Sequence, residues 1–387
     1  MTTNDPRITL SPDREPERVE VPFLDLHGMH ASVKEEILAD IADLIDTSAF
    51  SNGPPVAEFE RAFGQFCGTS SCVGVASGLD ALRLALVAAG IESGDEVIVP
   101  ANTFIATVEA VTQAGARPVL VDASEQDYNL DPAAVDAAVT PRSRYLLPVH
   151  LYGQLADMRA LGPLAERHGL GILEDACQAH GAERDGVRAG KAGFAAAFSF
   201  YPGKNLGAMG DAGALVTEDA ELAARVRMLR EHGQSRKYEH DVPGYTARLD
   251  TLQALVLLRK LPLLAGWNDE RRTAARYYAD ALAGVGDLVL PACAPGSEPV
   301  WHLYVVRTAE PDALAASLGE RGIRTGRHYP APIHLTRAYA HLGYRRGDFP
   351  IAERLAREVV SLPLFPGITE AQLDAVAAGV RAHFGQC

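Results

Sequence analysis

The most constraining feature of this chain is an alternation, from Val21 to about Leu261, of helical stretches with short uninterrupted apolar runs. These runs are rich in Leu and β-branched residues, as is typical of strands buried on both faces of a sheet. Helical patterns between the runs predict crossover connections, so we expect an α/β fold with a mostly parallel sheet wrapped by helices. The runs are Glu96–Pro100, Pro118–Asp122, Tyr145–Val149 and Gly171–Asp175, and the crossover helices are Thr103–Gly115 and Asp157–His168.

The pattern changes after Leu261, which predicts a second, smaller α+β domain. A polar helix is expected first, followed by a proline-rich loop, a strand and another helix. The first helix is expected at Trp267–Ala283, the strand at Trp301–Arg307 and the second helix at Asp312–Arg321. We divide the chain into an N-terminal tail over 1–20, a large domain over 21–265 and a small C-terminal domain over 266–387.

Charge and composition exclude several classes of function. The formal net charge is -14, with 36 Lys and Arg against 50 Asp and Glu, which opposes general binding to nucleic acid or anionic membranes. No apolar run reaches the roughly 18 residues of a membrane span, and the first twenty residues lack the apolar core of a secretion signal. The 5 cysteines form no CxxC pair. We expect reduced thiols in a cytoplasmic protein without a metal site.

Lys204 is the first candidate for chemistry. It lies among small and aromatic residues, with no neighbouring charge before Asp211. A lysine that attacks a carbonyl must lose its proton, and burial in a dry pocket lowers its pKa toward that state. The alternative, which this segment alone does not exclude, is a loop lysine that extends into water.

Two further segments suggest what this lysine could serve. Asp175 ends a predicted buried strand, where open α/β sheets bind ligands, and could hold a protonated pyridine nitrogen; a helix cap is the alternative. The turn Ser77–Gly78 joins a strand to a helix whose free N–H groups could bind a phosphate. The alternative is that Gly78 only allows the chain to turn between the strand and the helix. A phosphate site, an acid for a pyridinium and a low-charge lysine together match the needs of pyridoxal phosphate.

The sequence also resembles the DegT family of nucleotide-sugar aminotransferases, which are pyridoxal-phosphate enzymes of the aspartate-aminotransferase fold (fold type I). The resemblance covers nearly the whole chain after residue 20. The matching segments are Val21–Leu26, Gly53–Glu60, Ala76–Leu82, Gly94–Pro100, Asn102–Thr107, Glu174–Gly181, Phe198–Gly207 and Tyr329–His334.

The resemblance implies a seven-stranded sheet in the large domain and a role for each matching residue. Lys204 would bind the cofactor covalently and then carry the proton between the cofactor and the substrate carbon. Asp175 would keep the pyridine nitrogen protonated, Gln178 would reach the ring hydroxyl, and Phe104 would stack on the ring unless it is a buried core residue. The phosphate would be held by Ser77, Gly78, Leu79 and Ser199.

One position departs from the family pattern. Family members often carry an Asn that reaches the phosphate from the neighbouring subunit, two residues before an Arg; here Thr246 precedes Arg248. The shorter Thr246 side chain implies looser phosphate binding, within a homodimer that shares its active sites. Arg248 and Lys237 would meet the substrate diphosphate, unless they are solvated surface charges. Sugar contacts would come from His328, Tyr329 and His334, with a mobile surface loop as the alternative.

The expected reaction is transamination. The dehydratase branch of the family replaces the lysine with histidine or adds an iron–sulfur cluster, whereas this chain keeps Lys204 and lacks the cysteine spacing. L-glutamate would convert the cofactor to pyridoxamine phosphate, which would aminate a dTDP-linked keto-6-deoxyhexose. The form of the motif around Lys204 resembles that of family members that aminate carbon 3. Carbon 4, or a non-catalytic regulatory homologue, are the alternatives. An NAD enzyme fits less well, because Gly207–Gly213 matches no dinucleotide fingerprint.

Overall fold

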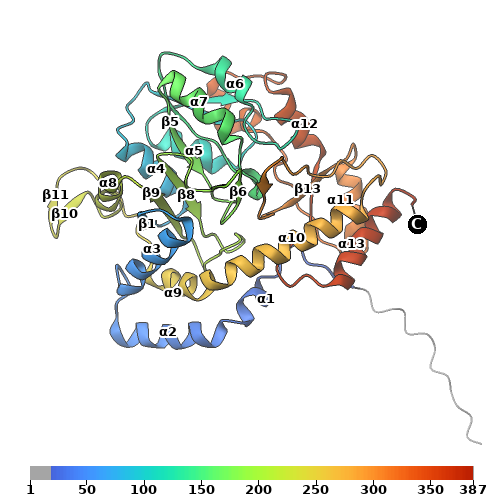
Figure 1. The fold of residues 1–387 in the computed structure, drawn as a ribbon, viewed down its shortest axis with the longest axis horizontal. Helices are drawn as coiled ribbons and strands as arrows, with labels where there is room; N and C mark the ends of the chain where they lie inside the picture. Colours follow the sequence, from blue (N-terminus) through green and yellow to red (C-terminus); the bar gives the residue numbers. More distant parts are fainter. Residues whose placement is uncertain (1–18, 387) are drawn as a thin grey trace, which may run out of the picture.

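A seven-stranded sheet forms the centre of the computed structural model, which describes residues 19–386 (Figure 1). Neighbouring strands run parallel, except that β9 is antiparallel to both β1 and β8. This confirms the predicted mostly parallel sheet. In spatial order the strands are β1 (Ser71–Val75), β9 (Gly213–Thr217), β8 (Ala195–Ser199), β5 (Gly171–Asp175), β4 (Ser143–Leu146), β2 (Glu96–Pro100) and β3 (Arg117–Val121).

Helices cover both faces of this sheet. The α-helices of the described residues, including those of the C-terminal part, are α1 (Leu26–Ala31), α2 (Lys34–Thr47), α3 (Pro54–Cys67), α4 (Gly78–Ala88), α5 (Ile105–Gln113), α6 (Pro132–Ala138), α7 (Met158–His168), α8 (Ala220–Arg230), α9 (Thr251–Lys260), α10 (Leu264–Ala281), α11 (Pro311–Glu320), α12 (Pro350–Glu358) and α13 (Glu370–His383). Side chains of each strand alternate between the faces: Val97 and Val99 pack with α4 and α5, whereas Ile98 packs with α6 and α7. Burial on both sides explains why the strands are continuously apolar.

Strand bounds were predictable where the apolar run is bulky. β2 and β5 have the predicted limits, and β3 and β4 begin earlier than predicted, by one and two residues. β8 and β9 were not predicted as strands, because β8 reads Ala195-Ala-Ala-Phe-Ser199 and lacks the β-branched residues that mark a strand. Its small side chains let α4 pack closely against the sheet.

The C-terminal part forms its own layer beside the sheet. Strands β13 (Tyr304–Arg307) and β14 (Val359–Leu362) pair antiparallel and pack with α10, α11 and α13 in one hydrophobic cluster. Val21 joins this cluster and bridges to Ile323, so the first described residues contact the C-terminal part. The division at 265/266 stays a prediction, since α10 begins at Leu264 and continues through it. The predicted tail over 1–20 lies, except for residues 19 and 20, outside the described residues.

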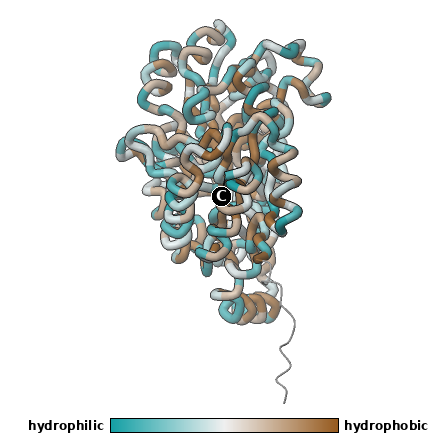
Figure 2. The backbone as a smooth tube through the Cα atoms, turned by 90° about the vertical axis from the view of Figure 1, so that its right-hand side faces the viewer, coloured by the Kyte–Doolittle hydropathy of each residue, from teal (hydrophilic) through white to brown (hydrophobic). Residues whose placement is uncertain are grey.

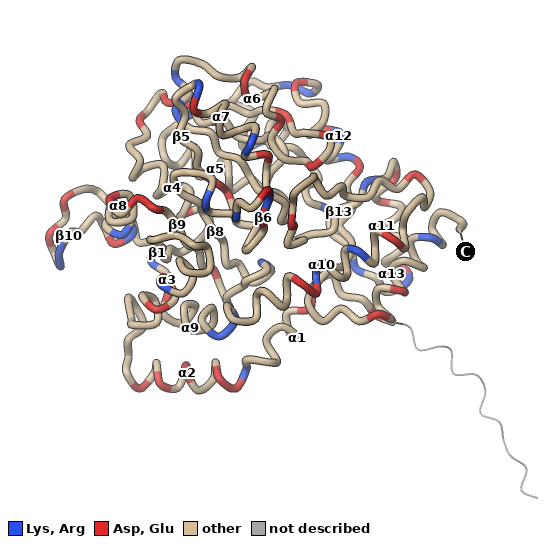
Figure 3. Tube along the Cα trace, in the orientation of Figure 1, with Lys and Arg blue, Asp and Glu red and all other residues tan. Residues whose placement is uncertain are grey.

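Besides the β13–β14 pair, two minor sheets of the described residues lie outside the central sheet. β6 (Glu183–Arg184), β7 (Val187–Arg188) and β12 (Ser297–Glu298) form a small sheet, and β10 (Gln234–Arg236) with β11 (Glu239–His240) forms a hairpin that projects from the body (Figure 1). Outer helices alternate hydrophobic and hydrophilic segments (Figure 2), and acidic residues line α2 (Figure 3). Within residues 19–386, no helix is both long and apolar enough to cross a membrane.

Candidate active site

A cavity of about 660 Å³ opens at the carboxyl ends of β2, β4 and β5, beside the start of α4. This is the edge of a parallel sheet where side chains from successive strands meet. The C-terminal part closes the far wall with His302, His328 and Tyr329. The lining also includes Phe23, Leu24, Ser77, Gly78, Leu79, Thr103, Phe104, Thr107, Glu109, Asp175, Cys177, Gln178, Ser199, Tyr201, Lys204 and Asp211.

Lys204 lies in this cavity on the loop that follows β8. Its backbone N–H donates to the carbonyl of Tyr201 at 2.8 Å, which fixes the turn that presents the side chain. Burial lowers the pKa of Lys204 below that of an exposed lysine, while Cys177 and Asp175 act in the opposite direction. The amine is therefore easier to deprotonate than a surface lysine, as a nucleophile requires.

Asp175 ends β5 and faces the same cavity, with its side chain held from two sides. Its Oδ2 accepts a hydrogen bond of 2.7 Å from the hydroxyl of Thr107, and its Oδ1 accepts one of 3.2 Å from the N–H of Cys177. Thr107 is on α5, 68 residues away in sequence. Two fixed donors leave the carboxylate one orientation relative to the cavity.

The Thr107 hydroxyl should therefore matter for activity although it carries no charge. We expect Thr107→Val, which keeps the side-chain shape, to lower kcat roughly tenfold, because a hydrogen bond to a charged group is worth about 1.5–3 kcal/mol and the Cys177 contact remains. Steady-state kinetics of the purified variant would measure this. Thr112→Val on the same helix is the control, since its hydroxyl bonds Val108 and Tyr339 instead. Equal kcat values for the two variants would contradict a positioning role for Thr107.

The turn at the start of α4, where the sequence predicts the phosphate to bind, lines the cavity. Ser77 caps the helix, with its Oγ accepting from the N–H of Asp80 at 3.0 Å. A Cβ on Gly78 would lie 2.6 Å from Cys177 Sγ and 2.8 Å from Ser199 Cβ, so only glycine lets the helix start approach β8 this closely. Free N–H groups at a helix N-terminus and the helix dipole both favour a bound phosphate.

Gln178 and Tyr329 form the opposite wall. Gln178 accepts from the N–H of Tyr152 at 2.7 Å and donates to the hydroxyl of Tyr329 at 3.1 Å. Tyr152 in turn donates to the carbonyl of His328. The Phe104 ring lies 5.6 Å from that of Tyr329 and is 51% exposed, so it is a cavity residue and not a core residue.

Three buried histidines, His180, His302 and His328, have pKa values that burial and the charge of Lys204 lower. Burial, together with Lys204, lowers the pKa of His328 to about 4 and that of His180 to about 3, and moves the pKa of His302 well below its usual value. His180 donates from Nε2 to the carbonyl of Ser199 at 2.9 Å. Neutral imidazoles leave the Lys204 amine without a competing positive charge near neutral pH.

Glu174, the residue before Asp175, points to the other face of the sheet. It is fully buried and accepts hydrogen bonds from the N–H groups of Gly190, Ala192 and Gly193 and from Nε2 of His150, at 2.8–3.0 Å. Burial raises the pKa of Glu174, but these hydrogen bonds prevail and lower it overall. Glu174 thus fixes the loop before β8 and takes no part in the cavity.

Four predicted substrate or cofactor residues lie elsewhere in this chain. Thr246 is exposed and contacts His232, and Arg248 pairs with Glu231 at 2.9 Å. His334 is buried in the short turn Ile333–Leu335 and bonds Glu353 at 3.0 Å, because that turn directs it away from the cavity. The structure does not bring His334 to Lys204, and its predicted sugar contact remains without structural support. Lys237 lies on the β10–β11 hairpin.

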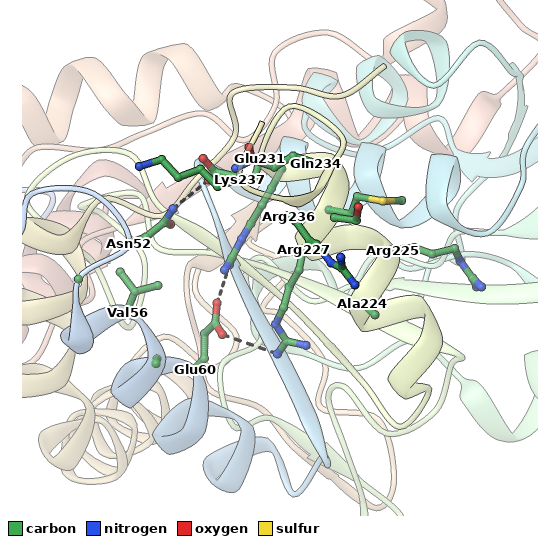
Figure 4. Close-up of a pocket in the computed structure, with 15 residues that line it drawn as sticks. Asn52, Val56, Glu60, Ala224, Arg225, Arg227, Glu231, Gln234, Arg236 and Lys237 are labelled. Atoms are coloured by element: carbon green, nitrogen blue, oxygen red, sulfur yellow. Dashed lines mark hydrogen bonds and ion pairs between the residues drawn. The ribbon is translucent and has the colours of Figure 1, made fainter. Parts of the chain in front are cut away.

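Lys237 lines a second cavity, of about 680 Å³, between α3, α8 and the hairpin. Both carboxylates of this cavity already have partners. Glu60 pairs with Arg227 (Figure 4) and with Arg230 at 2.5 Å, and Glu231 accepts from Asn52 at 2.9 Å and pairs with Arg248. Lys204 does not line it. In the part of the chain that the structure describes, no group of three or more His, Cys, Asp or Glu could hold a metal ion.

Sequence reasoning assigned no separate role to Thr107, Tyr201, His302 or the pair Phe23–Leu24. Thr107 and the pair stand inside segments that carry the family resemblance, but nothing local says that they face Lys204. His302 lies in the predicted small domain, beyond any sequence signal. Only the fold brings these residues to one cavity.

Comparison with known proteins places the chain in a family. Residues 31–381 match the model of the DegT/DnrJ/EryC1/StrS aminotransferase family. The dTDP-3-amino-3,4,6-trideoxy-alpha-D-glucose transaminase of Streptomyces venezuelae is 50% identical over 361 residues, 93% of this chain and 95% of that protein. The crystal structure of S. venezuelae DesV with a ketimine intermediate superimposes with a TM-score of 0.93 at 50% identity, covering 95% of this chain and 99% of DesV.

A more distant structure gives the same result. NtdA of Bacillus subtilis, solved with its cofactor PMP, has a TM-score of 0.89 at 32% identity and covers 97% of this chain and 87% of its own. Both the sequence match and the fold extend over the large sheet and the C-terminal part. The chain belongs to the DegT/DnrJ/EryC1/StrS aminotransferase family.

Proposed function

We propose that this chain is a pyridoxal-phosphate-dependent transaminase that transfers an amino group from L-glutamate to carbon 3 of a dTDP-linked keto-6-deoxyhexose. The observation that carries the proposal is the meeting of Lys204, Asp175 and the start of α4 in one cavity. The sugar and the carbon rest on the names of similar proteins, above all the S. venezuelae transaminase at 50% identity.

The cavity residues fit the cofactor chemically. One buried amine with a lowered pKa, Lys204, and one carboxylate, Asp175, line the same cavity as a helix N-terminus suited to a phosphate. Gly78 supplies the close approach that a bulkier residue would block. Phe104 offers an aromatic face and Gln178 an amide for the ring substituents. Lys204 matches the aldehyde of the cofactor, Asp175 its pyridine nitrogen, the helix start its phosphate and Gln178 its ring hydroxyl.

Each residue then has a defined task. Pyridoxal phosphate, when bound, supplies an aldehyde for amines and a ring that withdraws electrons from the substrate carbon. Lys204 Nζ binds the cofactor and afterwards takes and returns the proton of that carbon. Asp175 holds the positive charge of the pyridinium, and Ser77, Gly78, Leu79 and Ser199 hold the phosphate. The presence of both Lys204 and Asp175 in one cavity argues against a non-catalytic homologue.

We further propose a homodimer whose subunits share their active sites. Thr246, Arg248 and Lys237 lie outside the cavity of their own chain, as expected for residues that serve a partner. Around the cavity, Phe104 and Tyr201 are 51% and 58% exposed, which leaves an apolar rim for a second copy to cover. Sedimentation of the active enzyme at the mass of one chain would contradict this.

The free cysteines Cys67, Cys72, Cys177 and Cys293 support a cytoplasmic location.

The decisive experiment offers the purified enzyme a panel of dTDP- and UDP-linked 3-keto and 4-keto hexoses with L-glutamate. Mass spectrometry would detect the amino sugar, and NMR would assign the aminated carbon. We expect amination of a dTDP-3-keto-6-deoxyhexose. Amination of 4-keto sugars alone would shift the proposal to carbon 4. No amination of any sugar, with no cofactor bound, would refute it.

A further inference from the structure

Lys260, the last residue of α9, is a fully buried lysine that pairs with no carboxylate among residues 19–386. Its Nζ donates to the carbonyl of Gly207 at 2.5 Å and lies 3.1 Å from Nε2 of His30. Nζ also lies 5.9 Å from the centroid of the Trp267 ring. Burying an unpaired ammonium is costly, so an apolar residue would serve packing better unless the contacts themselves are needed.

The contact with His30 is a hydrogen bond of defined direction. Nδ1 of His30 lies 2.5 Å from the carbonyl of Leu26, and because a carbonyl only accepts, Nδ1 carries the hydrogen. Nε2 of the neutral ring is then the acceptor for Lys260. His30 belongs to α1, which follows Phe23 and Leu24 of the cavity wall.

Gly207 ends the loop that carries Lys204. A Cβ on Gly207 would lie 2.2 Å from the carbonyl oxygen of Pro202, so the loop closes tightly on itself between these residues. The N–H of Ala208 donates to the carbonyl of Phe200 at 2.7 Å and holds the two ends of the loop together. On its other side, the loop is held by Asn205, whose Nδ2 donates to Asn268 and to the carbonyl of Val300, both at 2.9 Å.

The loop therefore has two anchors, Asn205 toward α10 and Lys260 toward α9 and α1. Without Lys260, the carbonyl of Gly207 and Nε2 of His30 would both lose their donor inside the protein. Burial also lowers the pKa of Lys260 to about 8, which shows how dry this contact is. We propose that Lys260 is a positioning residue: by tying Gly207 to His30, it sets where Lys204 stands in the cavity and holds α1, which follows the cavity wall, against the same loop.

This inference rests on the proposed function, and its test uses the loaded enzyme. The variant Lys260→Met removes the donor and keeps most of the apolar volume. Lys191→Met is the matched control, because Lys191 also donates to a glycine carbonyl, that of Gly68 at 2.9 Å, but Gly68 is not on the loop that carries Lys204. The readouts are the pH titration of the visible band of bound pyridoxal phosphate, the rate at which L-glutamate bleaches that band, and the thermal midpoint.

We expect Lys260→Met to move the midpoint of the band titration by about half a pH unit or more, and to slow the glutamate reaction about tenfold with little change in the glutamate concentration for half-maximal rate. Lys191→Met should leave both unchanged. A lower thermal midpoint with an unaltered band and rate would overturn the proposal and make Lys260 purely structural.

His30 provides a second test should Lys260→Met not fold. His30→Leu removes the acceptor of Lys260 and should slow the glutamate reaction about threefold, whereas His30→Gln can both donate to Leu26 and accept from Lys260, and should restore the rate. Wild-type behaviour of both variants would also overturn the proposal. If wild-type protein shows no visible band with pyridoxal phosphate, it is the proposed function that fails.

Discussion

Replacing Lys204 with alanine should abolish transamination. We expect kcat to fall by roughly 10³-fold or more, because the variant loses both the amine that binds the cofactor and the base that moves the substrate proton. Borohydride reduction followed by mass spectrometry should attach the cofactor at Lys204 in the wild type and nowhere in the variant. Lys191→Ala, on the surface, is the control and should be labelled at Lys204 as usual.

The pH dependence of cofactor attachment adds a second signature. Burial lowers the pKa of Lys204 below the 10.5 of an exposed lysine, so the neutral amine becomes available at lower pH. The attachment rate should rise with pH and level off below pH 10.5. A Lys204→Ala enzyme that aminates at the normal rate would contradict the assignment of this residue, whatever the pH profile.

Changing Asp175 to asparagine should lower kcat by about 10²- to 10³-fold, because a fixed negative charge at the pyridinium disappears while the shape of the side chain remains. The asparagine oxygen can still accept from Thr107 or Cys177, so the fold should be kept. Steady-state kinetics together with the absorption spectrum of the bound cofactor would measure both effects.

A matched control separates charge from helix capping. Asp219 caps α8 through the N–H groups of Glu221 and Leu222 and lies outside the cavity. Asparagine caps helices as well as aspartate does, so Asp219→Asn should leave kcat unchanged. No helix of the described residues begins directly after Asp175, so if Asp175→Asn behaved like Asp219→Asn, Asp175 would serve only to hold the turn after β5.

The strand framework was predictable because burial on two faces leaves a direct mark on the sequence, as β2 and β5 illustrate. The place of Asp175 in the cavity was predictable for a related reason, because it ends an apolar run, whereas Lys204 was singled out by the lack of neighbouring charge before Asp211. Contacts made across the fold left no such mark. The Thr107–Asp175 hydrogen bond joins residues 68 positions apart, and the Lys260–His30 bond spans 230.

Side-chain direction was the other obstacle. His334 and Tyr329 belong to one matching segment, yet only Tyr329 lines the cavity, because the turn at Ile333–Leu335 rotates His334 toward Glu353. Strand β8 was not predicted from the sequence, because alanine packs well in a sheet but is a weak strand former. Such outcomes depend on the assembled molecule.

The neighbouring carboxylates Glu174 and Asp175 show what the pleat of a single strand can accomplish. Glu174 holds the loop before β8 and Asp175 faces the cavity, although they are adjacent in sequence, because successive side chains of a strand point to opposite faces of the sheet. Insertion or deletion of one residue in β5 would exchange their roles and spoil both at once. Variation that adapts such an enzyme to new sugars is therefore confined to the loops and the C-terminal wall, while the length of this strand stays fixed.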